Sequence, residues 1–575
     1  MTFRMMTRSI RGAACLAARL VAIPAIVCLT ACDTAATLLP GAPSDLTALP
    51  LDGAVSAAWS LGSEGGSALH NHAYSLDDGV TWTAFDPPVL AGGAVVGGLA
   101  NGELHRLRVR GVNTAGPGTP SSGVDAVAAL PSFLVAAHAP GHLQVLGLAP
   151  TRDGGVFVVG YDYGQATFGS IEPGQWSSES RGFVAKLDAD AAWVWKIDLP
   201  SPSGFSTSVD AIVPLSDGGA VVVGNFSETL DLGPLGTLQA PGSATFVAEL
   251  DADGVWLRAS VITAVGVVSN VIGRAVAVAP DGDVLVAGRL FGEVAFGAIT
   301  PAPKPSQDAF VARLAPDGVW RWAAVGGADA PTEALSLTLA SDGSVVIGGT
   351  TRSAQPIATL PSTGHAGNDD GFVAALSGDG TSWRWVVTVG GTGNDRVSDV
   401  AAIDGSIVAV GSYFATATFG GFGSRPPAFA SMQTSFLLRL SNDGAGERLT
   451  IVGASENSDL VRVVPRPGGG SFVAGALRGD VTIDGVLNGA GGAGPYLASF
   501  DADDTFVAAS VLVADPAATP FGGSGNPYAL TTAVGGVPVV GGQLYGALSD
   551  YVASVAQSGT QVDLFVWKTT PAEFK

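Results

Sequence analysis

The repeating pattern of this chain is clearest at Ala275-Val276-Ala277-Val278-Ala279-Pro280-Asp281-Gly282-Asp283-Val284-Leu285-Val286-Ala287-Gly288. Two apolar runs flank an Asp-Gly pair, and this arrangement is a strong signal for a β-hairpin. A longer connection leads to Ala309-Phe310-Val311-Ala312-Arg313-Leu314, a second Pro-Asp-Gly turn at 316–318, and Val319-Trp320-Arg321-Trp322. The stretch therefore predicts a unit of four strands joined mainly by tight turns.

This unit recurs seven times after residue 130. An apolar run that ends in glycine marks each copy, with successive glycines 64, 64, 60, 63, 64 and 66 residues apart: Gly160, Gly224, Gly288, Gly348, Gly411, Gly475 and Gly541. A second marker, an aromatic residue followed by two small or aliphatic residues, begins at Phe183, Phe246, Phe310, Phe372, Phe436, Tyr496 and Tyr551. Two independent markers in seven copies indicate one structural unit repeated in series.

Four-stranded units in series are typical of β-propellers, in which radial stacking leaves few open sheet edges. We therefore expect an all-β chain with a seven-bladed β-propeller over residues 132–570. Eight tryptophans are assigned to fourth strands, where they fill the gaps between blades or, alternatively, stack on a ligand: Trp193, Trp195, Trp256, Trp320, Trp322, Trp383, Trp385 and Trp567.

Closure of the propeller leaves two alternatives. Phe133–His138 and Leu564–Lys568 both resemble a fourth strand, which gives eight candidates for seven positions. One of them is then an extra edge strand or a linker. In either case the two ends of the propeller meet on the last blade.

The repeats resemble the bacterial seven-bladed β-propeller repeat family, whose units carry Asp-x-Phe-Val-Ala-Lys-Leu-Asp followed by Gly and Trp. The fourth unit matches best, with Asn-Asp-Asp-Gly-Phe-Val-Ala-Ala-Leu at 368–376, Asp-Gly at 379–380 and Trp-Arg-Trp at 383–385. Leu449 and Phe506 depart from the pattern, since they stand where tryptophan is expected. The resemblance implies the fold and carries no general activity.

Residues 43–129 have a different pattern. Short alternating strands, separated by Gly- and Asp-rich turns, predict a β-sandwich. This stretch resembles a fibronectin type III domain at Pro43, Trp59, Tyr74, Leu99, Val109–Asn113, Ala115-Gly116 and Pro120-Ser121. His105 departs from that family, because a tyrosine usually fixes the corner at this position.

A short motif inside this sandwich, Ser75-Leu76-Asp77-Asp78-Gly79-Val80-Thr81-Trp82, has the spacing of the Asp-box known from sialidase propellers. A single copy predicts a hairpin turn, in which Asp77 binds backbone amides and Gly79 allows a positive φ. His70 and His72 are expected in a solvated loop, because no third metal ligand is evident near them.

The first 31 residues have the features of a secretory signal, with four arginines, no acidic residue and the apolar stretch Leu20–Leu29. The sequence Leu29-Thr30-Ala31-Cys32 resembles a bacterial lipobox, which implies that lipid is attached to Cys32. Several acyl chains anchor a soluble domain stably, and residues 32–42 then form a tether. We therefore expect the membrane as a partner and a cell-envelope location, at the outer membrane or cell surface in preference to the inner membrane.

The chain has 28 basic and 50 acidic residues, a formal net charge of −22. This balance argues against nucleic acid as a partner, because phosphate binding needs clustered Lys and Arg. All three cysteines lie within the first 32 residues, so the mature chain is expected to lack disulfides and Cys-rich metal sites. Aspartates at 251–254 and 501–504 fit hairpin turns and lack a full calcium-loop pattern. Neither a cofactor nor a metal is expected.

The least repetitive segments connect a fourth strand to the next first strand, and the longest of them is Asp515–Asn526. Variable loops on a rigid scaffold are natural binding positions. The candidate ligand-contacting residues in these loops are Asn394, Asp395, Arg396, Asn457 and Asp459. The alternative is that the loops are simply solvated.

No set of catalytic residues emerges from the repeats, which contain three histidines and neither a Ser-His-Asp spacing nor a P-loop. We expect a lipid-anchored, exported scaffold whose propeller face binds a protein or a glycan, rather than an enzyme. One alternative is a secreted enzyme, a glycan-acting hydrolase or lyase that uses the same face. Another is a structural subunit of a cell-envelope assembly, which would expose a large apolar patch.

Replacing Cys32 with serine is expected to release the protein from membranes or to mislocalise it, because the substitution removes the thiol that would carry the lipid. Fractionation of expressing cells, followed by immunoblotting, measures this. The wild-type chain should sediment with its membrane fraction, and the Cys32→Ser variant should be found in a soluble fraction or in a different membrane fraction. Identical fractionation of the two proteins would contradict lipidation.

Overall fold

The computed structural model describes residues 38–569 except for 130–131, 140–141, 164, 175–176, 267, 303, 328–329, 354–356, 358–359, 361–366, 488–493, 515–523, 534–535, 546, 550–553 and 557–562. The signal segment and Cys32 therefore lie outside the described residues, as does most of the connection at 515–526. The described chain is all-β, which confirms the predicted class. No helix in this part of the chain is long and apolar enough to cross a membrane.

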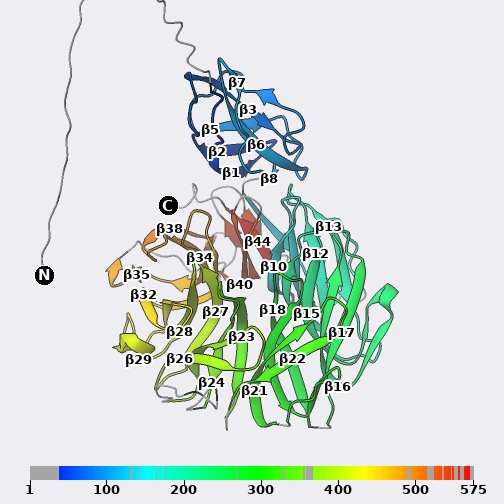
Figure 1. The fold of residues 1–575 in the computed structure, drawn as a ribbon. Coiled ribbons are helices and arrows are strands. Elements are labelled where there is room, and N and C mark those ends of the chain that lie inside the picture. The colour runs from blue at the N-terminus through cyan, green and yellow to red at the C-terminus, as the bar shows by residue number, and fades with distance from the viewer. Residues whose placement is uncertain are drawn as a thin grey trace, which may run out of the picture.

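Two sheets form the N-terminal unit (Figure 1). One sheet contains β1 (Ser44–Leu51), β2 (Ala54–Ser60) and β5 (Gly93–Gly97). The other contains β3 (Leu69–Ser75), β4 (Thr83–Ala84), β6 (Leu104–Asn113), β7 (Gly116–Pro117) and β8 (Val124–Val127). Trp59 and Val55 from the first sheet share one apolar core with Leu107 and Val109 from the second. The unit is therefore a two-sheet sandwich.

The predicted turn at 75–82 is confirmed. The Asp77 carboxylate accepts hydrogen bonds from the Thr81 amide (2.8 Å) and the Ser75 hydroxyl (2.7 Å). Gly79 has φ of 97°, and its carbonyl oxygen accepts from the indole nitrogen of Trp82 at 2.9 Å. Hydrogen bonds from Thr81 and Ser75 lower the pKa of Asp77 to about 2.

The expectation that His70 and His72 lie in a solvated loop is wrong, because both residues are part of β3. Successive residues of a strand face opposite sides of the sheet. His70 is therefore exposed, whereas His72 is 1% exposed and packs with its ring centroid 5.2 Å from that of Trp59. The Nδ1 atom of His72 lies 2.7 Å from the carbonyl oxygen of Val89, so this histidine belongs to the core.

Residues 133–568 contribute seven sheets of four main strands each to the described structure, numbered here in chain order. Sheet 1 contains β10 (Gln144–Pro150), β11 (Val156–Asp162), β12 (Arg181–Leu187) and β13 (Trp193–Leu199), and sheet 2 contains β14 (Ser208–Pro214), β15 (Ala220–Asp231), β16 (Thr237–Leu250) and β17 (Trp256–Ala264). Sheet 3 contains β18 (Asn270–Val278), β19 (Val284–Gly292), β21 (Lys304–Leu314) and β22 (Trp320–Val325), and sheet 4 contains β23 (Thr332–Leu339), β24 (Val345–Thr351), β25 (Asp370–Leu376) and β26 (Trp383–Gly391). Sheet 5 contains β27 (Arg396–Ile403), β28 (Ser406–Tyr413), β31 (Thr434–Leu440) and β32 (Gly446–Ala454), and sheet 6 contains β33 (Asn457–Pro465), β34 (Ser471–Arg478), β37 (Gly494–Phe500) and β38 (Phe506–Val511). Sheet 7 contains β40 (Ser524–Thr532), β41 (Pro538–Tyr545), β44 (Asp563–Lys568) and β9 (Phe133–Ala137).

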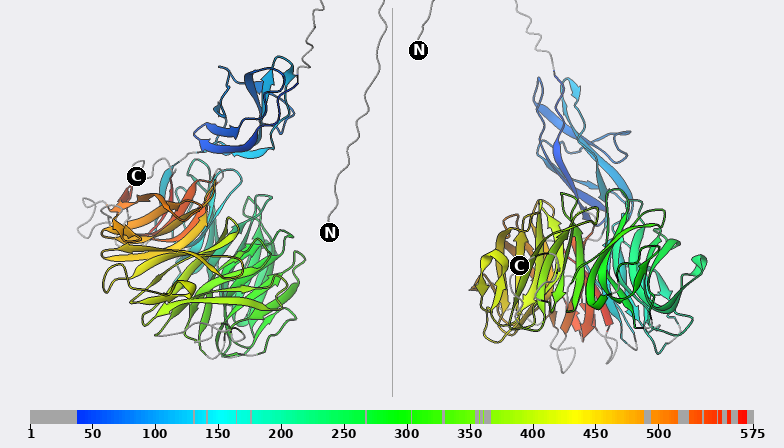
Figure 2. Two further views of the ribbon diagram at one scale, coloured as in Figure 1. Left: turned by 60° about the vertical axis from the view of Figure 1, so that its left-hand side comes forward. Right: turned by 60° about the horizontal axis from the view of Figure 1, so that its bottom comes forward.

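Each of these sheets buries its two faces against its neighbours. Val159 of sheet 1 shares an apolar cluster with Phe246 of sheet 2, and similar clusters join each later pair of successive sheets. Another cluster joins sheet 7 to sheet 1, where Val566 packs with Val145. The first strands, named the inner strands, contact one another in the same order, and β40 contacts β10. Figures 1 and 2 show the sheets fanning outward from these strands.

Sheet 7 is completed by a strand from the other end of the repeat region. β9 pairs antiparallel with β44, with Phe133 opposite Lys568 and Ala137 opposite Leu564. β44 is therefore the third strand and β9 the fourth, which decides between the two alternatives that the sequence leaves open. Trp567 consequently lies on a third strand, and its assignment to a fourth strand is wrong. Tyr551, the predicted marker of this third strand, lies outside the described residues.

The other seven tryptophans lie on the fourth strands β13, β17, β22 and β26, as predicted. Trp193, Trp256 and Trp320 are each less than a tenth exposed. The remaining four are partly buried against the clusters between sheets. These side chains therefore fill the gaps between neighbouring sheets.

Some connections between second and third strands add a short strand to the outer edge of the preceding sheet. β20 pairs with β17, β29 with β26, and β35 with β32. This pairing covers edge groups that would otherwise be open to other chains. The strands outside the seven four-stranded sets are β20 (Val294–Phe296), β29 (Ala417–Phe419), β30 (Ser424–Arg425), β35 (Val481–Ile483), β36 (Val486–Leu487), β39 (Val513–Ala514), β42 (Ala547–Ser549) and β43 (Ser554–Ala556).

The sandwich contacts the turns at one end of sheet 1. Asn101 donates through Nδ2 to the Asp190 carboxylate at 2.6 Å, in the turn between β12 and β13. Arg152, in the turn between β10 and β11, pairs with Asp125 of β8 at 3.3 Å. Both turns lie at the end of sheet 1 that is opposite to the first residue of β10.

Replacing Leu134 with alanine is expected to lower the free energy of unfolding by about 2–4 kcal/mol, because Leu134 fills the core between sheets 6 and 7. Urea unfolding followed by tryptophan fluorescence measures the change. Val194→Ala is the control, since Val194 is 51% exposed on β13 and its truncation should change stability by less than about 0.5 kcal/mol. Equal stability of the two variants would show that β9 does not complete sheet 7.

Candidate ligand-binding cavity

Each inner strand skips one residue where it pairs with the second strand of its sheet. In sheet 2, for example, Val209 pairs with Gly224 and Ala211 with Val223, so Asp210 is left out of the ladder. A bulge of this kind bends the strand and re-aims the extra side chain. The skipped residues, named the bulge residues, are Leu146, Asp210, Arg274, Leu335, Ser398, Val461 and Tyr528.

In sheets 1 to 6, a glycine on the second strand permits the bulge. A Cβ atom at Gly160 would lie 1.8 Å from the carbonyl oxygen of Gln144, and one at Gly224 would lie 2.2 Å from that of Ser208. The same close approach recurs in sheets 3 to 6, at Gly288, Gly349, Gly411 and Gly475. Most of the glycines that mark the repeat are therefore required by the approach of the inner-strand backbone. In sheet 4 the residue is Gly349, next to the marker.

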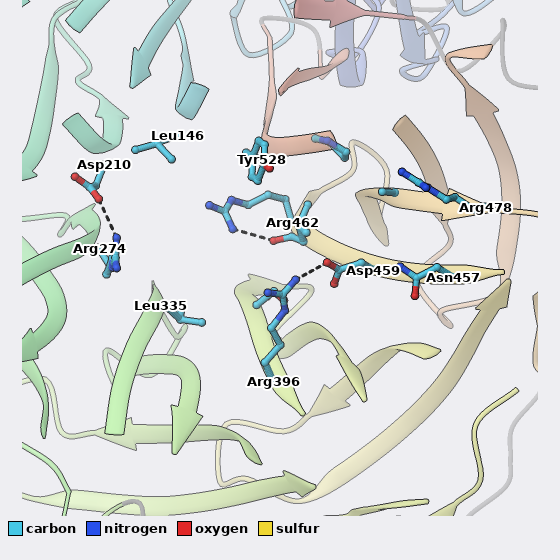
Figure 3. A pocket seen from close by; sticks show the side chains of 14 residues that line it. Leu146, Asp210, Arg274, Leu335, Arg396, Asn457, Asp459, Arg462, Arg478 and Tyr528 are labelled. Atoms are coloured by element: carbon cyan, nitrogen blue, oxygen red, sulfur yellow. Dashed lines mark hydrogen bonds and ion pairs between the residues drawn. The ribbon is translucent and has the colours of Figure 1, made fainter. Parts of the chain in front are cut away.

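All seven bulge residues line one cavity of about 490 Å³ (Figure 3). A volume in this range is typical of small-molecule sites. The remaining lining residues come from sheets 5, 6 and 7: Arg396, Asn457, Asp459, Arg462, Ala476, Arg478 and Pro527. Since every sheet contributes a residue, the cavity depends on the placement of all seven inner strands.

One wall of the cavity carries a network of charges centred on Arg274. Its guanidinium pairs with Asp210 at 3.1 Å and with Glu333 at 2.9 Å. The Asp210 carboxylate also accepts from the side chains of Ser208 and Asn225. Burial raises the pKa of Asp210, and the charge of Arg274 opposes that shift. The acidic groups of this wall are therefore already bound to donors of the protein.

The opposite wall carries three more arginines. Arg396 pairs with Asp459, whereas Arg462 donates through Nη1 to the carbonyl oxygen of Val461 at 2.9 Å. Arg478 is exposed at the end of β34. Within the described part of the chain, no carboxylate oxygen lies within 4.0 Å of the guanidinium nitrogens of Arg462 or Arg478. Two positive groups of the cavity are thus free of direct ion pairs.

Three buried polar atoms of the lining residues have no hydrogen-bond partner among the described residues. They are the hydroxyl oxygen of Ser398, the Nε atom of Arg396 and the Oδ1 atom of Asp459. Ser398 is one of the bulge residues that line the cavity, and it is only 6% exposed. Buried polar groups in folded proteins are nearly always satisfied by protein, water or ligand. These three atoms expose almost no surface, so an occupant of the cavity reaches this donor, acceptor and hydroxyl only if the side chains around them move.

Beneath this wall, Asp399 joins three sheets. Its carboxylate accepts a hydrogen bond from the hydroxyl of Ser336 on sheet 4. It also accepts one from the backbone amide of Val463 on sheet 6, at 2.9 Å. Burial raises the pKa of Asp399, while the nearby charge of Arg462 lowers it. The inner strands of sheets 4, 5 and 6 are therefore held together directly under the cavity.

The five residues singled out from the sequence take different places. Arg396, Asn457 and Asp459 line the cavity, whereas Asn394 is exposed outside it. Asp395 is 1% exposed, and its carboxylate accepts from the amides of Gly391 (2.7 Å) and Phe414 (2.8 Å). Asp395 therefore fixes a loop and does not line the cavity.

The bulge residues are not among the residues predicted from the sequence. Their signal is indirect, because a glycine inside a strand often marks a bulge or a close backbone approach. Counting back from each marker glycine across the predicted hairpin would have placed the skipped residue to within one or two positions. Which side chains then share a cavity depends on the packing of seven sheets.

The cavity is lined by charged, polar and apolar side chains. Its lining contains four arginines, two aspartates, one asparagine and one serine, beside the apolar side chains of Leu146, Leu335 and Val461 and the ring of Tyr528. Both aspartates are paired with arginine. Among the described residues, no group of three His, Cys, Asp or Glu side chains is placed to hold a metal ion.

Comparisons with known proteins give few matches of use. No family model matches the chain. No curated protein matches it. Among solved structures, a crystal structure of the FN1–FN3 domains of chicken CNTN1 covers 39% of this chain and 98% of that chain, at 13% identity and a TM-score of 0.14.

Acidification is expected to stabilise the fold through Asp395, whose pKa burial raises to about 6. Because this value lies above the ordinary 3.8, the folded state binds more protons between the two values, and stability rises as the pH falls from about 6 to about 4. The gain in the free energy of unfolding approaches about 3 kcal/mol. Urea unfolding of the wild type and of Asp395→Asn at pH 7.5 and 4.5 measures it.

Asp395→Asn is the matched control, because the side-chain amide of asparagine does not titrate in this pH range. The wild type should gain stability relative to the variant on acidification. Parallel pH profiles of the two proteins would contradict the raised pKa.

Proposed function

We propose that this chain is a lipid-anchored, exported protein that binds a glycan in a cavity at the centre of a seven-bladed β-propeller. One observation carries the proposal. Seven bulge residues, one from each sheet, line a single cavity whose residues hold buried polar atoms without partners. Leaving such atoms unsatisfied is unfavourable, so an occupant that reaches them as the lining side chains move gains affinity.

The propeller assignment is supported by the order of packing. Each sheet shares an apolar cluster with the next, and one cluster joins sheet 7 to sheet 1. β40 contacts β10 in the same way that each inner strand contacts its successor. β9 from the start of the repeat region supplies the last strand of sheet 7, as expected when the two ends of a propeller meet on one blade.

A glycan suits the cavity better than a protein surface does. The atoms without partners include a donor on Arg396, an acceptor on Asp459 and the hydroxyl of Ser398. A sugar hydroxyl donates and accepts at once, so neighbouring hydroxyls can satisfy all three. The ring of Tyr528 and the side chain of Leu335 offer apolar contact for the face of a sugar ring. The volume of about 490 Å³ limits the occupant to a few rings.

The sandwich, which resembles a fibronectin type III domain in sequence, would act as a spacer between the tether and the propeller. It contacts the turn that follows β10, at Arg152. Leu146 lies five residues before Thr151 on that strand, which is roughly 17 Å at about 3.4 Å per residue. The cavity would therefore lie at the end of sheet 1 that is remote from the sandwich and from the lipid anchor.

Binding is favoured over glycan hydrolysis or cleavage by the state of the carboxylates. Such an enzyme generally needs two carboxyl groups that flank the scissile bond. Asp210 and Asp459 line the cavity, yet each is held in an ion pair with an arginine. Each carboxylate is therefore already engaged by a guanidinium of the protein rather than placed free beside a bound sugar.

Replacing Leu335 with tryptophan is expected to abolish glycan binding, because the larger side chain fills part of the cavity. The experiment applies the full chain with Cys32→Ser, purified as a soluble protein, to a glycan array. Binding to a subset of glycans should be lost in Leu335→Trp and kept in Leu257→Trp, since Leu257 lies on β17, is 48% exposed and is outside the cavity. Glycan binding that survives Leu335→Trp, or no binding by any of these proteins, would refute the proposal.

A further inference from the structure

We infer that the glycan carries an acidic sugar, whose carboxylate binds Arg462 and is attracted also by the charge of Arg478; this inference rests on the proposed function. A uronic acid, a sugar ring bearing a carboxylate, is the simplest member of that class. The cavity combines three features that such a ring needs. They are cationic donors free of carboxylate partners, polar atoms for hydroxyls and apolar side chains for the ring face.

The first support is the local reversal of charge. The whole chain has 28 basic and 50 acidic residues, whereas the residues that line the cavity include four arginines and only two aspartates. Clefts lined by one sign of charge attract ligands of the opposite sign. On a surface that otherwise repels anions, this cavity is a place where an acidic ligand is favoured.

The second support is that the arginines are not equally occupied. Arg274 and Arg396 are each paired with an aspartate of the lining. Arg462 donates only to the carbonyl oxygen of Val461 among the contacts within the described residues, and Figure 3 shows its side chain extending into the middle of the cavity. Asp399 feels the charge of Arg462 from beneath, but lies beyond ion-pair distance and is bonded to Ser336, Val400 and Val463.

Arg478 supplies the second cationic group, nearer to solvent. It is the last residue of β34, and it is paired in register with Asn457 of β33, another lining residue. Guanidinium groups bind carboxylates through charge-assisted, often bidentate hydrogen bonds. A carboxylate at this wall would receive donors from Arg462, and Arg478, which lies opposite Asn457 and five residues along β33 from Arg462, would add its charge from farther along the wall. Hydroxyls of the same ring would lie beside Ser398, Arg396 and Asp459.

The test compares two disaccharides that differ only in charge, one ending in glucuronic acid and the other in glucose. Isothermal titration of the soluble full chain should show at least tenfold tighter binding of the acidic sugar. Arg462→Ala should weaken that binding about tenfold and Arg478→Ala about threefold, because Arg478 acts through its charge from a greater distance, and both variants should bind the neutral sugar nearly as the wild type does. Arg478→Lys should retain part of the preference, because the charge remains without the planar fork. Raising the salt concentration should weaken the binding of the acidic sugar and leave the binding of the neutral sugar unchanged.

Arg448→Ala is the control variant, since Arg448 lies on the outer strand β32 and does not line the cavity. It should bind both sugars as the wild type does. Equal affinity for the two sugars, unaffected by Arg478→Ala, would overturn the acidic class while the proposed glycan binding stands. Failure to bind either sugar, with the array also blank, would overturn both. Tighter binding of an acidic tripeptide than of either sugar would assign the cavity to a peptide and overturn the inference.

Discussion

The burial of apolar faces between neighbouring sheets is the constraint on which the rest of this molecule depends. A single four-stranded sheet has two apolar faces and cannot hide either one alone. Phe133 and Leu134 are adjacent on β9, yet Phe133 packs into the cluster shared with sheet 1 and Leu134 into the cluster shared with sheet 6. Each sheet is therefore fixed by both neighbours, and the inner strands take positions that no single sheet determines.

The same arrangement explains why a glycine, rather than a charged or aromatic residue, is the strongest signal of the repeat. Gly224 is needed because the carbonyl of Ser208 comes so close that a Cβ atom would collide with it. That approach accompanies the bulge at Asp210, and the bulge turns Asp210 toward the cavity. A residue with no side chain on one strand thus decides where a cavity-lining side chain on the neighbouring strand points, and the bulge residue itself differs from sheet to sheet.

Much of the fold is predictable from the sequence, because Asp-Gly turns and alternating apolar runs act over a few residues. The turn at Asp77 and the fourth-strand tryptophans follow from such local signals. The order of sheet 7 does not, because the pairing of Phe133 with Lys568 joins residues about 430 positions apart. The cavity is predicted only in part. Asp395 and Arg396 are neighbours, and only the register of β27 makes the first a buried loop support and the second a cavity residue.

The pairing of β9 with β44 has a consequence for how the chain reaches its final form. Contacts between distant residues are entropically expensive and form late. During translation β9 is synthesised before the six sheets that follow it, and β44 is synthesised after them. Phe133 and Leu134 therefore have no pairing strand until those six sheets have been translated. The last step of folding then seals the first and last sheets together, and the nascent protein has no complete pocket until almost its whole length has been made.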